Sequence, residues 1–175
     1  MPELVEPPLQ AAGPVRRTPA RVYTPEQRRR RDASPWTLVQ GILAPVQFLV
    51  FLASLALVLR YLWTGAGYQT ATLSVVLKTL TLYAIMITGS IWEKAVFGRY
   101  LFASAFFWED VFSMLVLALH TAYLVALSRG VLGPTPLMLL ALAAYAAYVV
   151  NAAQFLRKLR LAHLEEPAGG REALA

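Results

Sequence analysis

The sequence contains no cysteine. A disulfide framework and a thiolate metal site are therefore both excluded. Charge is also scarce, because Asp, Glu, Lys and Arg make up 15% of the chain and hydrophobic residues 58%. A soluble domain usually carries about 25% charged residues and under about 50% apolar ones. This balance excludes an ordinary soluble domain.

The uncharged residues are gathered in long runs. No formal charge occurs between Asp32 and Arg60, from 111 to 128 or from 130 to 156, and the stretch 71–92 carries only Lys78. A membrane-spanning helix needs about 20 mostly apolar residues. The sequence therefore predicts an all-α fold, an integral membrane four-helix bundle with spans at 36–62, 70–92, 106–128 and 137–157.

The two ends of the chain differ from this interior. Residues 1–25 hold six prolines and predict a disordered tail rich in Pro and Arg. Residues 163–175 predict a flexible tail, which leaves 26–162 as the transmembrane domain. Thr24 and Pro25 are typical of a helix start, and so are Ser34 and Pro35 before the first span. Pro45 inside that span should kink the helix or free a carbonyl.

The basic residues indicate an orientation. Seven Lys or Arg residues precede the first span, Lys94 and Arg99 lie in the 93–105 loop, and four more follow the last span, whereas Arg60 and Arg129 alone mark the other side. Cytoplasmic segments carry the excess of Lys and Arg, so both termini are predicted to be cytoplasmic. The block of arginines at 28–31 suits an anionic membrane surface or serves only as a topology anchor. This distribution along the apolar runs does not favour a nucleic-acid partner.

Polar residues within the third span are the sharpest functional signal. Glu109, Ser113 and His120 share one face of a helix, with Glu109 and His120 about 16 Å apart along it. Asp110 is rotated by about 100° from Glu109. Ionisable residues inside a membrane mark a functional site by default. The alternatives are that Glu109 and Asp110 cap the helix at the interface and that His120 makes an interhelical hydrogen bond.

The other three spans also carry polar side chains. Glu93 ends the second span near the level of Glu109, and Lys78 in that span is expected to snorkel outward rather than form a buried ion pair. Polar stripes on the first and fourth spans consist of Gln40, Gln47 and Ser54, and of Tyr145, Tyr148, Asn151 and Gln154. A stripe on every helix favours a lined cavity.

Several classes of protein lack their motifs in this sequence. It has no nucleotide-binding loop, no paired histidine–acid metal motif and no nucleophile elbow. Its two histidines, His120 and His163, do not form a bis-histidine haem pattern. The sequence is also compatible with a small transporter whose path is lined by Lys78 and the glutamates.

Five collinear motifs carry a family resemblance. They are RRDASPWTLVQGILAPVQF at 30–48, IWEKAVFGRY at 91–100, FFWED at 106–110, LHTAY at 119–123 and YVVNAAQF at 148–155. Over about residues 25–162 the chain resembles the 3-vinyl (bacterio)chlorophyllide hydratases of bacteriochlorophyll synthesis.

The resemblance implies an enzyme that adds water to the C3 vinyl group of chlorophyllide a or of 3-vinyl bacteriochlorophyllide. The product is the 3-(1-hydroxyethyl) derivative, and no cofactor is expected. It also implies a bacterial cytoplasmic membrane, either the inner or the intracytoplasmic photosynthetic one. The expected partners are this pigment substrate and the lipid bilayer, with a homo-oligomer or other pigment-synthesis enzymes possible in addition. The competing interpretation is a non-catalytic pigment-binding or assembly subunit of the photosynthetic apparatus.

Hydration of a vinyl group requires a general acid and a group that takes a proton from water. A carboxyl group in an apolar site can stay protonated for the first task. Glu109 is the first candidate for the acid, Glu93 is the second, and Asp110 is a candidate for orienting the water. His120 is either the base or an axial ligand to the substrate magnesium.

Further residues are candidates for binding the pigment. Arg99 could pair with the propionate carboxylate. The aromatic side chains that could stack on the macrocycle are Trp92, Phe106, Phe107 and Trp108, which could equally form an interfacial belt. Asn151 and Gln154 complete the candidate set.

Overall fold

A computed structural model describes residues 22–164, which form α-helices and no strand. The helices are α1 (Pro25–Ala33), α2 (Pro35–Thr64), α3 (Tyr68–Phe97), α4 (Phe107–Arg129) and α5 (Pro134–Leu164). The last four are long and apolar enough to cross a membrane, as the sequence predicts. Most of the two expected tails, residues 1–21 and 165–175, lies outside the described residues.

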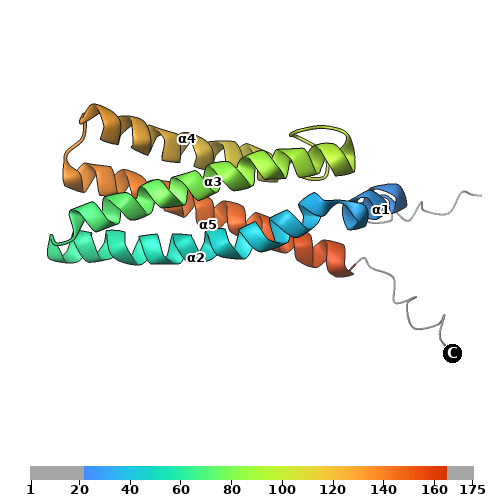
Figure 1. Cartoon of the computed structure of the whole chain (residues 1–175), viewed down its shortest axis with the longest axis horizontal. Coiled ribbons are helices and arrows are strands. Elements are labelled where there is room, and N and C mark those ends of the chain that lie inside the picture. The colour runs from blue at the N-terminus through green and yellow to red at the C-terminus, as the bar shows by residue number, and fades with distance from the viewer. Residues whose placement is uncertain (1–21, 165–175) are drawn as a thin grey trace, which may run out of the picture.

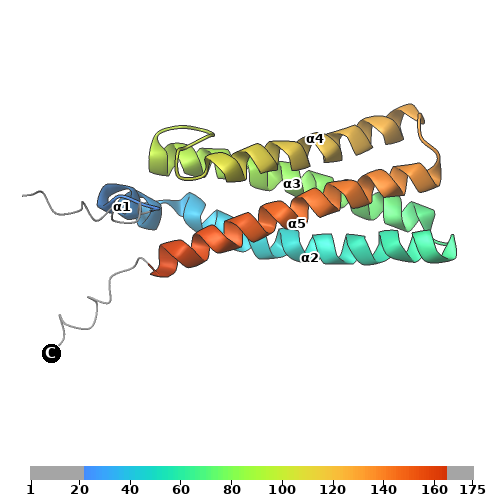
Figure 2. The same ribbon diagram turned by 180° about the vertical axis from the view of Figure 1, so that it is seen from behind.

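The four long helices form two antiparallel hairpins. α2 packs mainly on α3 and α4 mainly on α5, with fewer contacts between the hairpins. The turns at 65–67 and 130–133 lie at one end of the bundle, while α1, the 98–106 loop and the end of α5 lie at the other (Figure 1). The view from behind shows α5 crossing the bundle toward that second end (Figure 2). We call this second end the α1 end.

Local sequence sets the ends of the helices. Thr24 caps α1 by accepting a hydrogen bond from the Gln27 backbone N–H, and the Gln27 side chain accepts one in return from the Thr24 N–H. Gly98 ends α3 in the left-handed region, at φ +78°, which glycine adopts without a steric cost. α5 begins at Pro134 rather than at the predicted residue 137. The two prolines fit its first turn because the backbone N–H groups there have no intrahelical partner.

Two apolar clusters hold the bundle together. The larger one fills the interior between the four long helices. The smaller one, at the α1 end, buries Tyr23, Val96, Phe106 and Ala162. The Tyr23 ring stacks on Phe97 at 5.8 Å, and burial raises the pKa of Tyr23 to about 12. Ordered structure therefore begins inside the stretch that the sequence predicts as a tail.

Lys78 differs from its predicted place. It is 0% exposed, and its ammonium lies 3.7 Å from the centroid of the Tyr148 ring on α5. The outward snorkelling expected from the sequence is wrong, because the rotation of α3 in its hairpin turns this side chain toward the bundle interior.

Candidate functional site

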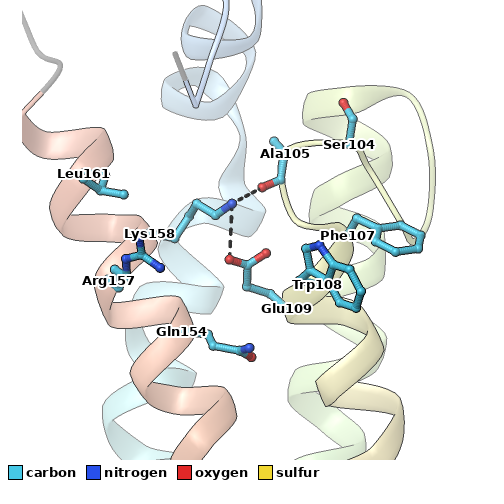
Figure 3. A pocket seen from close by; sticks show the side chains of 9 residues that line it. All are labelled: Ser104, Ala105, Phe107, Trp108, Glu109, Gln154, Arg157, Lys158 and Leu161. Carbon is cyan, nitrogen blue, oxygen red and sulfur yellow. Dashed lines mark hydrogen bonds and ion pairs between the residues drawn. The ribbon is translucent and has the colours of Figure 1, made fainter. Parts of the chain in front are cut away.

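A cavity of about 350 Å³ opens at the α1 end between the start of α4 and the end of α5 (Figure 3). Its lining is formed by Ser104, Ala105, Phe107, Trp108, Glu109, Gln154, Arg157, Lys158 and Leu161. Among these residues Glu109 is the one acid. The cavity thus combines a carboxyl group, two basic side chains and two aromatic rings.

Glu109 and Lys158 form an ion pair in this cavity. Glu109 lies in the first turn of α4 and is 7% exposed, and its Oε1 is 3.2 Å from the Lys158 Nζ on α5. The same Nζ also donates to the backbone carbonyl of Ala105 in the 98–106 loop (Figure 3). One ammonium therefore ties together α5, α4 and the loop that covers them.

Glu93 and Asp110 meet behind this loop and are absent from the cavity lining. The Asp110 Oδ2 accepts the Phe102 N–H at 2.6 Å, and the Glu93 Oε2 accepts the Ala103 N–H at 3.3 Å. The two carboxyl groups lie close enough to interact with each other. Phe102 has a φ of +59°, a region that a bulky residue rarely adopts. The pair of acids thus holds a strained loop in place.

The structure does not bring His120 to the cavity. His120 is 0% exposed and lies eleven residues along α4 from Glu109, about 16 Å away at 1.5 Å per residue. Its Nδ1 is 2.8 Å from the Val116 carbonyl oxygen, and its ring lies 5.9 Å from the ring of Tyr145. Its surroundings are therefore the middle of the bundle.

The four candidate aromatic residues separate into two pairs. Trp92 and Phe106 belong to the aromatic cluster at the α1 end, with ring centroids 5.7 Å apart, and the Trp92 Nε1 donates to the Thr37 Oγ1 at 2.9 Å. Phe107 and Trp108 line the cavity instead, and Trp108 is 66% exposed. Only the second pair offers free ring surface next to Glu109.

The two basic residues of the cavity, Arg157 and Lys158, are interpreted from the sequence only as signals of membrane orientation. Arg157 and Lys158 follow Gln154 by three and four residues on α5, so they share its face. Arg99 is exposed in the 98–106 loop and does not line the cavity. The helical spacing from Gln154 is the signal that could have identified Arg157 and Lys158.

The two predicted amides of α5 point toward α4. The Asn151 Nδ2 donates to the Ser113 Oγ at 2.9 Å in the bundle interior. Gln154 lines the cavity, and its side chain extends below Glu109 (Figure 3). The expected face of Glu109 and Ser113 on α4 is therefore opposite Asn151 and Gln154.

The fold and the site together define a class of protein. It is a helical bundle of membrane-spanning length with a charged, aromatic-rimmed cavity at one end. Such a cavity suits an amphipathic molecule with a flat apolar body and an anionic group.

Comparison with known proteins identifies the family. Residues 23–161 match the sequence model of the 2-vinyl bacteriochlorophyllide hydratase (BCHF) family, and the chain belongs to this family. A protein of that name in Rhodobacter capsulatus is 66% identical over 145 residues, which cover 82% of this chain and 84% of the relative. Another in Cereibacter sphaeroides is 64% identical over 162 residues, covering 92% and 98%. No solved structure matches the chain.

Proposed function

We propose that this protein is a hydratase that adds water to the vinyl group of a bacteriochlorophyllide during bacteriochlorophyll biosynthesis. The observation that carries the site is the Glu109–Lys158 ion pair, 3.2 Å across, in the cavity beside Trp108. An enzyme of this kind needs a proton-transferring group next to a surface that binds a flat apolar ring. The carboxyl group of Glu109 and the exposed ring of Trp108 line one cavity, which supports this proposal.

The reaction consumes one water and leaves a secondary alcohol. A proton adds to the terminal carbon of the vinyl group, and the resulting cation on the inner carbon is delocalised into the macrocycle. Water then bonds to that carbon and gives up a proton, which restores the proton donor. Glu109 is our candidate for the group that transfers these protons, because it is the acid of the cavity. In the ion pair the proton lies on the Lys158 ammonium, and the Glu109 carboxylate takes it up before passing it to the vinyl group. Lys158 holds its carboxyl group in position and balances its charge.

The remaining carboxyl groups have a different task in this proposal. Glu93 and Asp110 bind consecutive backbone N–H groups of the 98–106 loop. They position the loop that carries Ser104 and Ala105 into the cavity wall. Asp110 adjoins Glu109 in sequence, so it also fixes the first turn of α4 from which Glu109 projects.

Pigment binding is assigned to the exposed rings and to Arg157. Phe107 and Trp108 offer faces on which a macrocycle can stack. Arg157 lines the same cavity and can pair with the propionate carboxylate, the task first assigned to Arg99. His120 would reach the substrate magnesium only with a macrocycle inserted deep in the bundle. A His120→Ala variant with unchanged pigment affinity would exclude His120 as an axial ligand.

Comparison of the free acid with the methyl ester of the pigment tests whether Arg157 binds the propionate carboxylate. Arg157→Ala should raise KM for the free acid about tenfold, as expected for the loss of one charge-assisted hydrogen bond of about 1.5 kcal/mol. It should leave KM for the methyl ester of the pigment unchanged, since that substrate has no carboxylate. Arg99→Ala is the matched control, and a larger effect from Arg99 than from Arg157 would reverse the assignment.

The orientation follows from charge. We place the α1 end on the cytoplasmic side, because it holds Lys94, Arg99, Arg157 and Lys158 as well as the arginines of α1. The protein would then lie in a bacterial cytoplasmic membrane, and its cavity would open near the surface from which an amphipathic pigment enters. A cysteine introduced at the exposed position of Arg99 should react with an impermeant thiol reagent only from the cytoplasmic face.

Isotope incorporation tests the activity. Membranes containing the protein are incubated with the vinyl pigment in water enriched in ¹⁸O, and the pigment is analysed by mass spectrometry. A hydratase produces a pigment heavier by one molecule of water, with ¹⁸O in the new hydroxyl group. Pigment that co-purifies with the protein but stays unchanged would refute the hydratase and leave a pigment-binding subunit.

A further inference from the structure

A set of buried polar atoms lies in the middle of the bundle, outside the cavity. Lys78 and His120 are each 0% exposed, and they contact Tyr148 and Tyr145, which lie one turn apart on α5. Among residues 22–164 neither the Lys78 Nζ nor the His120 Nε2 has a hydrogen-bond partner. The ring of Tyr148 contacts the ammonium through its face, which does not use the three N–H donors as hydrogen bonds.

More unpaired polar atoms lead from this pair toward the cavity. The side-chain nitrogen and oxygen of Gln47, the Asn151 Oδ1 and the Gln154 Oε1 are all buried without a partner among the described residues. Gln154 already lines the cavity. These six unpaired atoms form one series that ends at the proposed active site, whereas Ser34, Thr72 and Tyr123 carry the other unpaired side-chain oxygens found in the described part of the chain.

The helix geometry places these amides between the two sites. The Phe51 ring on α2 packs on Tyr148 of α5, with centroids 4.8 Å apart. Gln47 lies one turn from Phe51 and Asn151 one turn from Tyr148, each on the side nearer the α1 end, because the two helices run in opposite directions. Both amides thus lie between the Lys78–His120 pair and Gln154.

Water is the ligand that this arrangement fits. A buried polar group without a partner costs about 1–3 kcal/mol, and a charged group costs more. Lipid chains offer no donor or acceptor, whereas water offers both, and a buried water usually makes about three hydrogen bonds to polar groups of this kind. The unpaired atoms include both donors and acceptors. The ammonium donates, the imidazole nitrogen can accept, and the amides supply oxygens that accept and, at Gln47, a nitrogen that donates.

We propose that the Lys78–His120 pair binds internal water, which continues past Gln47, Asn151 and Gln154 as a file that supplies the Glu109 cavity. This inference rests on the proposed hydratase function, because water is the co-substrate of that reaction. Lys78 is a positioning residue, since it acts on the reaction only through the water that it holds. A pigment that stacks across the cavity mouth would block water from the surface. The file fills through the cavity before the pigment binds and then holds the water that the reaction uses.

Hydroxyl-radical labelling detects such water without any substrate. A short X-ray pulse on the full-length protein in lipid nanodiscs converts bound water into radicals that modify adjacent aromatic side chains. We expect labelling of Tyr145 and Tyr148, which contact His120 and Lys78. Met138 is 0% exposed and belongs to the same apolar cluster, but it lies about two helical turns or more from these tyrosines toward the start of α5. It should stay unlabelled although methionine reacts readily with radicals. A folded wild-type protein with Tyr145 and Tyr148 unlabelled would overturn the proposal.

Variants then assign the water to named residues. Lys78→Met should reduce the labelling of Tyr148 and lower kcat by at least about tenfold, with KM for the pigment within about twofold. Lys78→Gln retains donors and should restore both, which separates water binding from folding. Lys94→Met on the same helix is the matched control. Equal Tyr148 labelling in Lys78→Met and in wild type would contradict the site.

A time-resolved version tests the connection to the cavity. After rapid mixing with H₂¹⁸O, wild-type Tyr148 should acquire ¹⁸O within the shortest delay, while Asn151→Leu should slow this uptake. Uptake at the wild-type rate in Asn151→Leu would overturn the file, because water would then reach Tyr148 without passing Asn151. Normal labelling in a wild-type protein without hydratase activity would refute the proposed function and the co-substrate route while leaving the water site.

Discussion

Replacement of Glu109 by glutamine is the most direct test of the proposed chemistry. Gln has almost the same shape and can still accept a hydrogen bond from the Lys158 Nζ, 3.2 Å from the Glu109 Oε1. It cannot transfer a proton. General acid–base catalysis contributes about 10²- to 10⁴-fold, so kcat should fall by that factor, or about 3–5 kcal/mol of transition-state stabilisation.

The fold should tolerate this change. The Lys158 side chain is 25% exposed, and a pair that reaches solvent contributes about 1 kcal/mol or less. Pigment affinity should therefore persist while turnover is lost. The assay follows conversion of the vinyl pigment in nanodiscs by chromatography and mass spectrometry, with pigment binding measured by its absorption shift.

A carboxyl group of the same type at the same end of the molecule serves as the control. Glu26 on α1 is exposed and pairs with Arg29 at 2.9 Å and Arg30 at 3.0 Å, but it is not part of the cavity. Glu26→Gln should keep the wild-type kcat. A Glu109→Gln enzyme with wild-type turnover would refute Glu109 as the proton-transfer group.

Three further predictions concern the stability of the bundle, each measured by thermal unfolding in detergent. Ser54→Ala removes hydrogen bonds of 2.5 Å to the Tyr145 hydroxyl and of 2.7 Å to the Ser74 hydroxyl and should cost about 0.6–2 kcal/mol; an unchanged midpoint would mean that the tyrosine finds another partner. Trp92→Phe keeps an aromatic ring in the cluster but loses the bond to Thr37, so a loss of at least about 0.5–1.5 kcal/mol is expected, and an unchanged midpoint would refute a stabilising role of this bond. Tyr23→Ala should cost about 3–5 kcal/mol and expose α1 to protease, whereas a neutral result would show that α1 does not need this anchor.

The four spans were predictable because their signal is length and hydropathy. A run of about 20 apolar residues has few other stable environments, and the glycines after α3 and α4 mark their ends. The start of α1 at Pro25 was predictable from its capping residues. The rotation of α3 was not, because a single lysine among apolar residues does not show which side of the span faces the bundle. Lys78 was misplaced for this reason.

The candidate site was predictable in part, and the part that could not be predicted depends on the path of the 98–106 loop. The spacing on α4 identifies Glu109, and the spacing on α5 identifies Gln154. The path of the 98–106 loop depends on Phe102 at positive φ, a conformation that no preference of phenylalanine indicates. That loop removes Arg99 from the cavity and places Phe106 in the core, so both assignments required coordinates.

The hairpin arrangement has a consequence for how the chain is made. Lys78 lies in the first hairpin, whereas the ring that covers its ammonium, Tyr148, lies in the last helix to be synthesised. A lysine near the centre of a span raises the free energy of membrane insertion by about 2.5–3.5 kcal/mol. Insertion into the bilayer is therefore least favourable for α3 among the four spans, and α3 is stabilised only when α5 has been inserted and packs against it. A chain that stops before α5 would leave a marginal helix in the membrane, which cellular proteases can recognise and remove.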